Sequence, residues 1–224
     1  MSLAIRAAGV GKSFRDASRV VDVLRDVAFE AEAGEFAAIV GPSGSGKTTL
    51  LNILGGLDVA DAGTVDIGGT DLTRLSGEEL ARFRNRQIGF VFQFHQLLPD
   101  FTAVENVMLP TRIAGWSARQ AADRARELLV EVGLEDRLEH YPSQLSGGEQ
   151  QRVAMCRALA LDPPVLLADE PTGNLDPATG RRVFDLLMEL HDHHRMTAVL
   201  VTHNPSVADR CAKIWRLEEG ILRS

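Results

Sequence analysis

Cysteine, aromatic residues and long apolar runs are all scarce in this chain of 224 residues, which holds two Cys, one Tyr and two Trp. Cys156 and Cys211 sit in segments typical of helices and lack the spacing of metal ligands, so we expect a reduced, cytosolic protein. No run approaches the ~20 apolar residues of a membrane-spanning helix, and the first residues lack the apolar core of a signal peptide. If the protein works at a membrane, other subunits must supply the spans.

An excess of positive charge is also missing. The 24 Lys and Arg residues face 31 Asp and Glu, for a net charge of −7. This balance argues against a nucleic-acid role that rests on a general basic surface, and we expect no nucleic-acid partner. The local basic stretch at Arg82, Arg84 and Arg86 is better explained as a solvated face or a contact with a protein partner. The length fits one large domain, or a domain with a subdomain.

The most informative segment runs from Gly41 to Thr48 and reads GPSGSGKT. It matches G-x-x-x-x-G-K-[ST], the loop that wraps the phosphates of a nucleoside triphosphate. The apolar run 36–40 before it predicts a buried strand. A helix should follow the loop, because leucines continue at helical spacing: Leu50, Leu51, Leu54 and Leu57. Backbone N–H groups at the start of that helix would face an anion, and glycines let the backbone come close. We expect Lys47 to bridge the β- and γ-phosphates and Thr48 to bind Mg²⁺.

Strand and helix patterns along the rest of the chain predict an α/β fold. Short alternating segments predict a small antiparallel sheet: 3–10, 20–24, 27–31 and 64–69. Apolar runs predict buried strands: 88–92, 164–168 and 197–202. A polar helix is expected over 76–86, and Asp176 with Pro177 predicts the start of another, whose buried face would hold Val183, Leu186, Leu187 and Leu190.

The middle of the chain is expected to be helical. Ser117 and Gln120 form a capping-box pattern, and Gly133 is a reasonable end for the helix that they start. One apolar stripe would cover that helix: Ala118, Ala121, Ala122, Ala125, Leu128, Leu129 and Val132. A second helix should start after 145–148. The pattern predicts an insertion into one α/β core rather than a separate domain.

Charged and polar residues stand at the ends of apolar strands, where ligands bind in parallel α/β sheets. Asp169 and Glu170 close the strand at 164–168, and His203 follows the strand at 197–202. Two acids lining a dry core would be costly, so a ligand crevice is the better explanation. We expect Asp169 to hold Mg²⁺ together with Thr48. Glu170 is placed to orient the water that attacks the γ-phosphate, mainly by positioning it.

A second candidate for phosphate binding is the segment 145–151, with the sequence LSGGEQQ. Ser146, Gly147 and Gly148 precede a helix, so free N–H groups would again lie at its positive end. A simple N-cap turn explains the same residues equally well when the segment is taken alone.

Taken in order, these motifs resemble those of the ATPase subunits of ABC transporters, over essentially the whole chain. The loop 41–48 is similar to the Walker A motif, 165–170 to Walker B with its catalytic Glu, and 145–150 to the LSGGQ signature, with Glu149 where Gln is commonest. Gln93 matches the Q-loop, Asn174-Leu175-Asp176 the D-loop and His203 the switch histidine.

The resemblance implies a P-loop NTPase core of the RecA-like type with a mostly parallel sheet. An N-terminal antiparallel β subdomain and an inserted helical subdomain would complete it. Residues 1–224 would form one ABC ATPase domain, with the α/β core over about 1–93 and 159–224 and the helical subdomain over about 94–158. ATP and Mg²⁺ are the implied cofactors. ATP would contact Phe14, Gly41, Ser43, Gly44, Ser45, Gly46, Lys47, Thr48 and Thr49.

The resemblance also implies a homodimer in the ATP state, with each ATP held between Walker A of one subunit and the signature of the other. Ser146, Gly147, Gly148 and Glu149 would then bind the nucleotide of the partner subunit, and Asp176 would lie at the dimer interface. The implied catalytic residues are Glu170, His203 and Gln93, and the implied Mg²⁺ ligands are Thr48, Gln93 and Asp169. Phe14 would stack on adenine, where Tyr is commoner; local core packing is the alternative for it.

The segment 92–107, together with 169–176, is similar to a subgroup that contains lipoprotein-releasing, macrolide-export and cell-division ATPases, and closest to the lipoprotein-releasing kind. Integral membrane subunits and a peripheral position on the cytoplasmic face of the inner membrane follow from that similarity. Gln96 stands where a second His is frequent, and Asn204 where Asp is common. Two alternatives stay open: a regulatory ATPase of cell division, and a non-transport ABC protein on ribosomes or DNA, which one cassette without a basic arm disfavours.

Histidines gather near the end of the helix that is expected to begin at Asp176. The cluster comprises His191, His193 and His194, with Asp192 among them, and it suggests a metal site. Histidine near a helix C-terminus is also favourable against the helix dipole, and this explanation is preferred from the sequence. We therefore expect no metal other than Mg²⁺.

Overall fold

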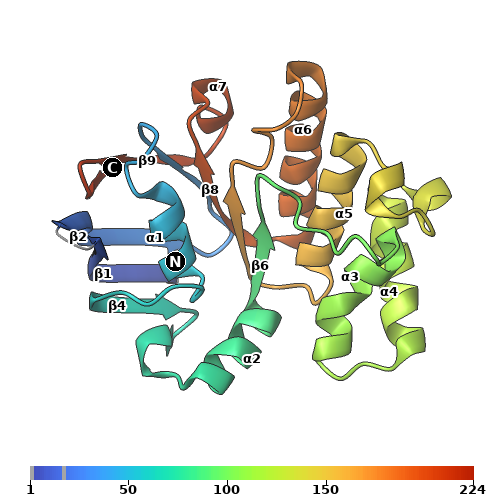
Figure 1. Ribbon diagram of the computed structural model, residues 1–224, viewed down its shortest axis with the longest axis horizontal. Coiled ribbons are helices and arrows are strands. Elements are labelled where there is room, and N and C mark those ends of the chain that lie inside the picture. Colours follow the sequence, from blue (N-terminus) through green and yellow to red (C-terminus); the bar gives the residue numbers. More distant parts are fainter. Residues whose placement is uncertain (1–2, 17–18) are drawn as a thin grey trace. The chain divides into compact units, whose positions relative to one another are not determined.

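The computed structural model describes residues 3–16 and 19–224 (Figure 1). They form two compact units, each described by itself. The first unit comprises Met1–Ala81, Leu167–Asp169 and Met196–Ser224, and the second Arg82–Leu166 and Glu170–Arg195. No helix among the described residues combines the length and apolar character that crossing a membrane requires.

The first unit contains the antiparallel sheet that the sequence predicts. Its strands run in the order β2-β1-β4-β5, with β1 at Leu3–Asp16, β2 at Arg19–Glu32, β4 at Ala62–Ile67 and β5 at Thr70–Asp71. The prediction of two separate pieces at 20–24 and 27–31 is wrong, because β2 runs through both. Asp26 adopts a left-handed φ of 50° within β2, and the register with β1 shifts between the Val10–Val27 and Lys12–Leu24 pairs. A bulge of this kind bends a strand without ending it.

A second sheet carries the loop 41–48 after its strand β3. Its order is β10-β9-β3-β8-β7-β6, and the last of these strands, β6 at Ile88–Val91, belongs to the second unit. The strands are β3 at Phe36–Val40, β7 at Val165–Asp169, β8 at Thr197–Thr202, β9 at Lys213–Glu218 and β10 at Ile221–Arg223. β3 pairs in parallel with both β8 and β9, and β10 pairs antiparallel with β9. Every residue of β8 is buried, as expected for a strand that is covered on both faces.

Short helices complete the first unit. Helix α1 covers Lys47–Leu54, and α7 covers Pro205–Ala208. Leu57 does not extend the buried face of α1 as predicted: the helix stops at Gly55, Gly56 takes a left-handed φ of 64°, and Leu57 is 45% exposed. Helix α2, at Gly77–Gln87, begins in the first unit and ends in the second. Cys211 lies after α7 rather than in a helix, which corrects the expectation for that residue.

The second unit is built mainly of helices. They are α3 at Ala103–Ile113, α4 at Ala118–Glu131, α5 at Gly147–Leu159 and α6 at Pro177–His194, together with short 3₁₀ turns at Glu135–Arg137 and Pro142–Gln144. Strand β6, at Ile88–Val91, neighbours β7, whose first two residues belong to this unit. The unit therefore includes the whole segment 94–158 and, in addition, β6 and α6.

Capping explains where these helices begin. The Ser117–Gln120 box forms as predicted, with Ser117 N donating to Gln120 Oε1 over 3.1 Å. Thr102 and Glu105 form a further box at the start of α3, a helix that the sequence patterns did not delimit. The predicted stripe of α4 is confirmed for five residues but not for Ala118 and Ala122, which are not buried.

The buried face of α6 differs from the predicted one at two positions. Phe184 is buried, whereas Leu186 is partly exposed. Val183, Leu187 and Leu190 are buried as predicted. Asp176 caps the helix as the sequence indicates, and accepts hydrogen bonds from Ala178 N and Thr179 N over 3.0 and 3.1 Å.

Candidate nucleotide-binding site

The loop between β3 and α1 has the geometry of a phosphate cradle. Gly44 and Gly46 have left-handed φ values of 78° and 99°, which non-glycine residues rarely adopt. Gly46 is the N-cap of α1, and no side chain caps that helix end. The first N–H groups of a helix have no intrahelical acceptor and carry a partial positive charge, so an anion fits there.

Gly41 is required by close packing. A Cβ at this position would lie 2.2 Å from the backbone oxygen of Leu217 on β9 and 2.9 Å from Ser45 Oγ. Ser45 Oγ is itself buried and, within the described part of the chain, makes no hydrogen bond. A buried hydroxyl usually has a partner, and a phosphate oxygen is one that this loop could receive. The loop residues therefore fit a bound nucleotide.

Lys47 is held inside the same loop. Its side chain is largely buried, and Nζ donates to the carbonyl oxygens of Gly41 and Pro42 over 3.0 and 2.9 Å. An ammonium group has three N–H donors, so these two carbonyls orient it while leaving a further donor for a ligand. The lysine is thus positioned before any phosphate arrives.

Thr48 and Asp169 meet as the sequence predicts. Thr48 Oγ1 donates to Asp169 Oδ2 over 2.9 Å, which joins the start of α1 to the end of β7. Two neighbouring oxygen ligands of an octahedral Mg²⁺ at 2.0–2.1 Å would lie about 2.9 Å apart. The pair therefore has the spacing and the chemistry that a magnesium ion needs.

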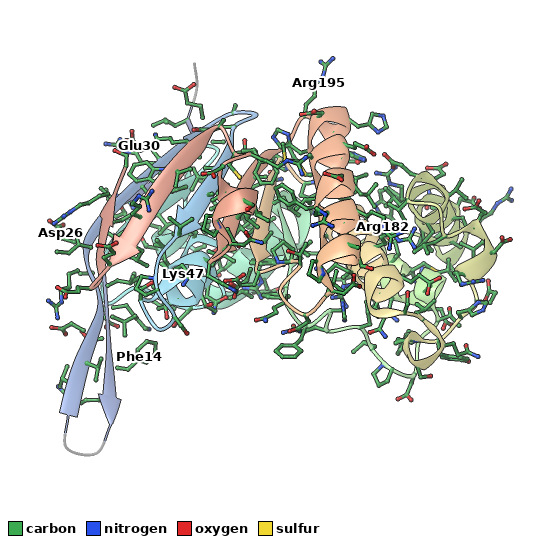
Figure 2. All side chains as sticks on the ribbon, turned by 90° about the horizontal axis from the view of Figure 1, so that it is seen from above. Phe14, Asp26, Glu30, Lys47, Arg182 and Arg195 are labelled. Atoms are coloured by element: carbon green, nitrogen blue, oxygen red, sulfur yellow. The ribbon has the colours of Figure 1, made fainter. Side chains whose placement is uncertain are left out.

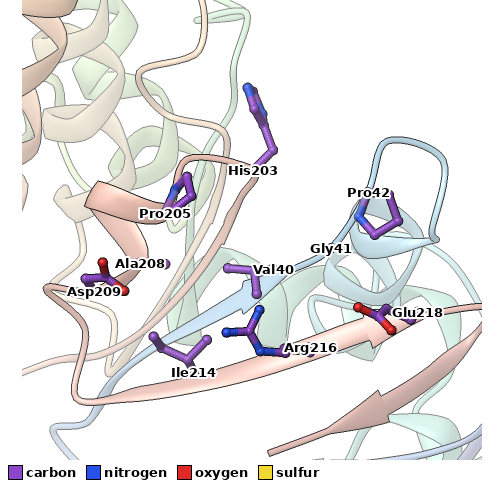
Figure 3. Close-up of a pocket in the computed structure, with 10 residues that line it drawn as sticks. All are labelled: Val40, Gly41, Pro42, His203, Pro205, Ala208, Asp209, Ile214, Arg216 and Glu218. Carbon is purple, nitrogen blue, oxygen red and sulfur yellow. The ribbon is translucent and has the colours of Figure 1, made fainter.

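His203 borders the phosphate loop within the first unit. It follows β8 and lines a pocket of about 280 Å³ together with Val40, Gly41 and Pro42 (Figure 3). Arg216 on β9 lines the same pocket. The His203 side chain therefore lies beside the loop, on the side where β3 ends.

Phe14 lies on the long hairpin of β1 and β2 and is not part of a core (Figure 2). Its side chain is 46% exposed, and Lys12 Nζ lies 5.2 Å from the centre of its ring. Lys12 is fixed in turn by Asp58 Oδ1 at 2.9 Å. The exposure argues against the alternative of local core packing, and the open ring is suited to stacking.

In the second unit, Gln93 forms a reciprocal pair with Asn174. Gln93 Nε2 donates to Asn174 Oδ1, and Asn174 Nδ2 donates to Gln93 O, both over 3.0 Å. A Cβ at Gly173 would lie 3.0 Å from Gln93 Nε2, so this glycine makes room for the pair. The segment after β6 and the segment before α6 are thereby joined, a contact that the sequence motifs did not reveal.

Ser146 is the N-cap of α5 and forms a capping box with Glu149. Ser146 N and Oγ both donate to Glu149 Oε2, over 2.8 and 2.7 Å. Arg137 Nε donates to Glu149 Oε1 over 3.1 Å. These hydrogen bonds from Ser146, followed by the bond and charge of Arg137, lower the pKa of Glu149 below its ordinary value. Glu149 stands where the LSGGQ signature most often has an uncharged Gln, and Arg137 balances the negative charge that Glu149 adds.

Gly148 allows α5 to pack closely against α6, since a Cβ there would lie 2.6 Å from Thr179 Cγ2. Asp176, the N-cap of α6, has a pKa below its ordinary value because of hydrogen bonds from Thr179 and Ala178. Glu170 adopts a left-handed φ of 46°, and its carbonyl accepts a hydrogen bond from Gly173 N over 2.9 Å. Non-glycine residues held in this region are often found at functional sites.

The predicted site residues therefore fall into two groups. The first unit holds Phe14, the loop with Lys47, Thr48 and Thr49, Asp169 and His203, whereas the second holds Gln93, the 146–149 segment, Glu170 and Asp176. Sequence reasoning missed Arg137 and the contact between Gln93 and Asn174. Arg137 lies 12 residues before Glu149 with no local pattern linking the two.

Comparisons with known proteins show the family to which the chain belongs. The family model described as "ABC transporter" matches residues 24–173. The chain is 52% identical over 216 residues to the "Lipoprotein-releasing system ATP-binding protein LolD" of Syntrophotalea carbinolica, covering 96% of this chain and 95% of the relative. It is 48% identical to the protein of the same name from Legionella pneumophila (strain Paris), covering 94% and 93%.

A solved structure, the "Dimeric structure of a post-hydrolysis state of the ATP-binding cassette MJ0796 bound to ADP and Pi", is 41% identical and superimposes with a TM-score of 0.90 over 98% of this chain and 97% of that one. This likeness confirms the predicted P-loop NTPase fold, with its antiparallel sheet, its mostly parallel sheet and its helices. The family match, over residues 24–173, covers well over half of the chain. The chain belongs to the ABC transporter family, as one of its ATP-hydrolysing cassettes.

Proposed function

We propose that this ATPase powers the release of lipoproteins from the bacterial inner membrane, as a subunit of a membrane complex. Support comes from relatives named for that system, which match nearly the full chain at about half identity. For ATP hydrolysis, the observation that carries most weight is the Thr48–Asp169 pair at the end of a loop that fits a triphosphate. These two lines of support are independent, because one rests on relatives and the other on geometry.

In this proposal, the residues of the first unit hold the nucleotide. Phe14 stacks on adenine, the N–H groups of the loop bind the phosphates, and Lys47, oriented by the loop carbonyls, bridges the β- and γ-phosphates. Thr48 and Asp169 would hold Mg²⁺, which neutralises charge on the β- and γ-phosphates when bound, and the family resemblance implies Gln93 as a further ligand. His203 donates a hydrogen bond to the γ-phosphate.

Residues of the second unit complete the reaction. Glu170 orients and polarises the attacking water, and Gln93 reports the state of the nucleotide. Ser146, Gly147 and Gly148 bind the nucleotide of a second copy of the chain, and Asp176 lies at the interface between the copies. Solved relatives of this chain are described as dimeric, which supports a homodimer. The Glu149 carboxylate accepts hydrogen bonds from Arg137 and from Ser146 at its own helix cap. In this proposal these contacts hold its negative charge away from the phosphates.

The membrane subunits are proposed to bind where apolar side chains follow Gln93. Phe94, Leu98 and Phe101 are 68%, 42% and 37% exposed within the second unit. Exposed apolar side chains that gather in one segment mark contacts with a partner. The partners would resemble the LolC and LolE subunits, and the chain would sit peripherally on the cytoplasmic face of the inner membrane.

Reconstitution tests this function. The chain is expected to co-purify with LolC- and LolE-like subunits of its own organism, and proteoliposomes holding this complex should release a bound lipoprotein only when ATP is added. The Glu170→Gln variant in the same complex serves as the control and should release none. Association with membrane subunits of the macrolide-export or cell-division type alone would overturn the assignment. ATP-independent binding to RNA or DNA that weakens with salt would instead favour a non-transport protein.

The role of Phe14 gives a separate prediction. Replacing Phe14 by Ala should raise the Kd for ATP by about 10-fold, since stacking of a base on an aromatic ring contributes about 1–3 kcal/mol. Phe14→Tyr should keep the affinity, because the ring remains. Titration calorimetry with a non-hydrolysable ATP analogue measures both.

Val21→Ala is the matched control for Phe14. Val21 pairs with Phe14 across the same hairpin and is similarly exposed, at 43%. Its replacement should leave the Kd unchanged. Equal affinities for Phe14→Ala and the unmodified chain would remove Phe14 from the site.

A further inference from the structure

Two histidines and a glutamate from different parts of the second unit converge at one point. Glu131 is the last residue of α4, and His193 and His194 are the last two residues of α6, directly before Arg195 (Figure 2). One nitrogen or oxygen atom of each side chain lies within 4.8 Å of the others. From the sequence alone the histidines are better explained by the helix dipole, because nothing there connects them with Glu131, 62 residues earlier.

The distances in this cluster suit a small divalent cation. Glu131 Oε1 lies 2.7 Å from His193 Nδ1 and 3.4 Å from His194 Nε2. Zinc binds imidazole nitrogen and carboxylate oxygen at about 2.0–2.2 Å, so ligands in a tetrahedral shell lie roughly 3.3–3.6 Å apart. The His194–Glu131 distance falls within that range, and the His193–Glu131 distance is shorter. A set of two His and one Glu is one that zinc takes in proteins, with a solvent molecule in the fourth position.

His194 is oriented as a metal ligand usually is. Its Nδ1 atom lies 3.2 Å from Asp162 Oδ1, in the turn that follows α5, and Asp162 is held in turn by Arg124. A carboxylate behind one ring nitrogen directs the other nitrogen toward the metal. That other nitrogen, Nε2, is buried and makes no hydrogen bond among the described residues, even though Glu131 is near.

We propose that Glu131, His193 and His194 form a zinc-binding site, with Asp162 as the residue that orients His194. None of its ligands is a Walker or signature residue, although Glu131 lines a pocket that also holds Ser146 and Glu149. Bound zinc would tie the C-terminus of α4 to the C-terminus of α6 within the second unit. This assignment does not depend on which substrate the ATPase serves.

Metal binding by the full-length chain tests the proposal. After treatment with a chelator, and with excess Mg²⁺ present to fill oxygen-ligand sites, the chain should bind one Zn²⁺ in competition with a zinc indicator. Co²⁺ in place of zinc should give the visible absorption of a four-coordinate site. Saturating zinc should raise the melting temperature by about 5–10 °C, as a ligand at about 100 times its Kd does for a chain of this size.

Variants connect the binding to these residues. His194→Ala should weaken zinc binding by at least about 100-fold. Asp162→Asn should weaken it by about 10-fold, since a residue that hydrogen-bonds a metal ligand contributes 10–100-fold to affinity. His140→Ala, a histidine outside the cluster, should bind zinc as the unmodified chain does. Melting temperatures without metal show whether each variant is folded. The proposal is overturned if His194→Ala binds with unchanged affinity, if the unmodified chain shows no four-coordinate Co²⁺ spectrum, or if one zinc bridges two chains.

Discussion

Replacing Glu170 by Gln is expected to lower kcat for ATP hydrolysis by about 10²–10⁴-fold while ATP still binds. The substitution keeps the size of the side chain and removes the carboxylate that would orient the attacking water. With hydrolysis blocked, the ATP-bound dimer should persist, because the γ-phosphate stays between the two copies. Phosphate release measures the loss of turnover, and light scattering after gel filtration in Mg-ATP measures the dimer.

Glu219→Gln is the matched control for this substitution. Glu219 is exposed and, like Glu170, has a left-handed backbone, with φ values of 50° and 46°. Its amide variant should hydrolyse ATP within about two-fold of the unmodified rate, in keeping with the small effects of surface substitutions. Near-normal hydrolysis by Glu170→Gln would assign the water to another residue, and a monomer in ATP would argue against the shared site.

Replacing Lys47 by Ala should raise the Kd for ATP by about 100-fold or more, the usual cost of removing one partner from a buried, hydrogen-bonded charge pair. The ammonium is almost fully buried and is oriented by two loop carbonyls. Solvent therefore cannot supply the positive charge and hydrogen bonds that the substitution removes. Lys47→Arg should not restore binding, because a planar guanidinium cannot occupy the space of a compact ammonium. Calorimetry with a non-hydrolysable analogue measures the change.

Lys213→Ala removes an equal charge from another strand of the same unit. Lys213 Nζ lies 4.5 Å from the centre of the Trp215 ring, and the residue has no place in the proposed site. Its variant should bind ATP with unchanged affinity. If both lysine variants lost affinity equally, a general charge effect would explain the result and the specific role of Lys47 would be excluded. A melting temperature for each variant separates binding from folding.

Features encoded by neighbouring residues were predicted well from the sequence. The loop at 41–48, the buried strand before it and the cap at Asp176 each depend on a few adjacent positions whose glycines, apolar runs or cap residues act locally. The Thr48–Asp169 contact followed from a topological rule, because ligands collect where parallel strands end. What the family implies for Glu170, Gln93 and His203 remains a prediction.

Features that depend on distant residues could not be predicted. The partner of Glu149 is Arg137, and that of Gln93 is Asn174, 81 residues further along the chain; neither pair leaves a periodic pattern. On α6, Phe184 is buried and Leu186 is not, contrary to the prediction. Contacts with neighbouring elements, and not spacing alone, decide which residues at the edge of an apolar face are buried.

The predicted boundaries of β2 and α1 were wrong for a different reason. Asp26 interrupts the alternation in β2 but keeps the strand going through a bulge, whereas Gly55 and Gly56 end α1 although Leu57 continues its spacing. In both cases one backbone conformation overrides the side-chain pattern. Left-handed residues other than glycine are hard to foresee, since the structure around them holds them in place.

One of the points where the chain passes between its two units is the peptide that joins Asp169 to Glu170. In their proposed roles, the first of these residues holds the cation and the second aims the water. The two proposed roles therefore meet at one peptide bond. The backbone conformation of Glu170, with its left-handed φ of 46°, sets the direction of its carboxylate relative to the cation ligand that precedes it.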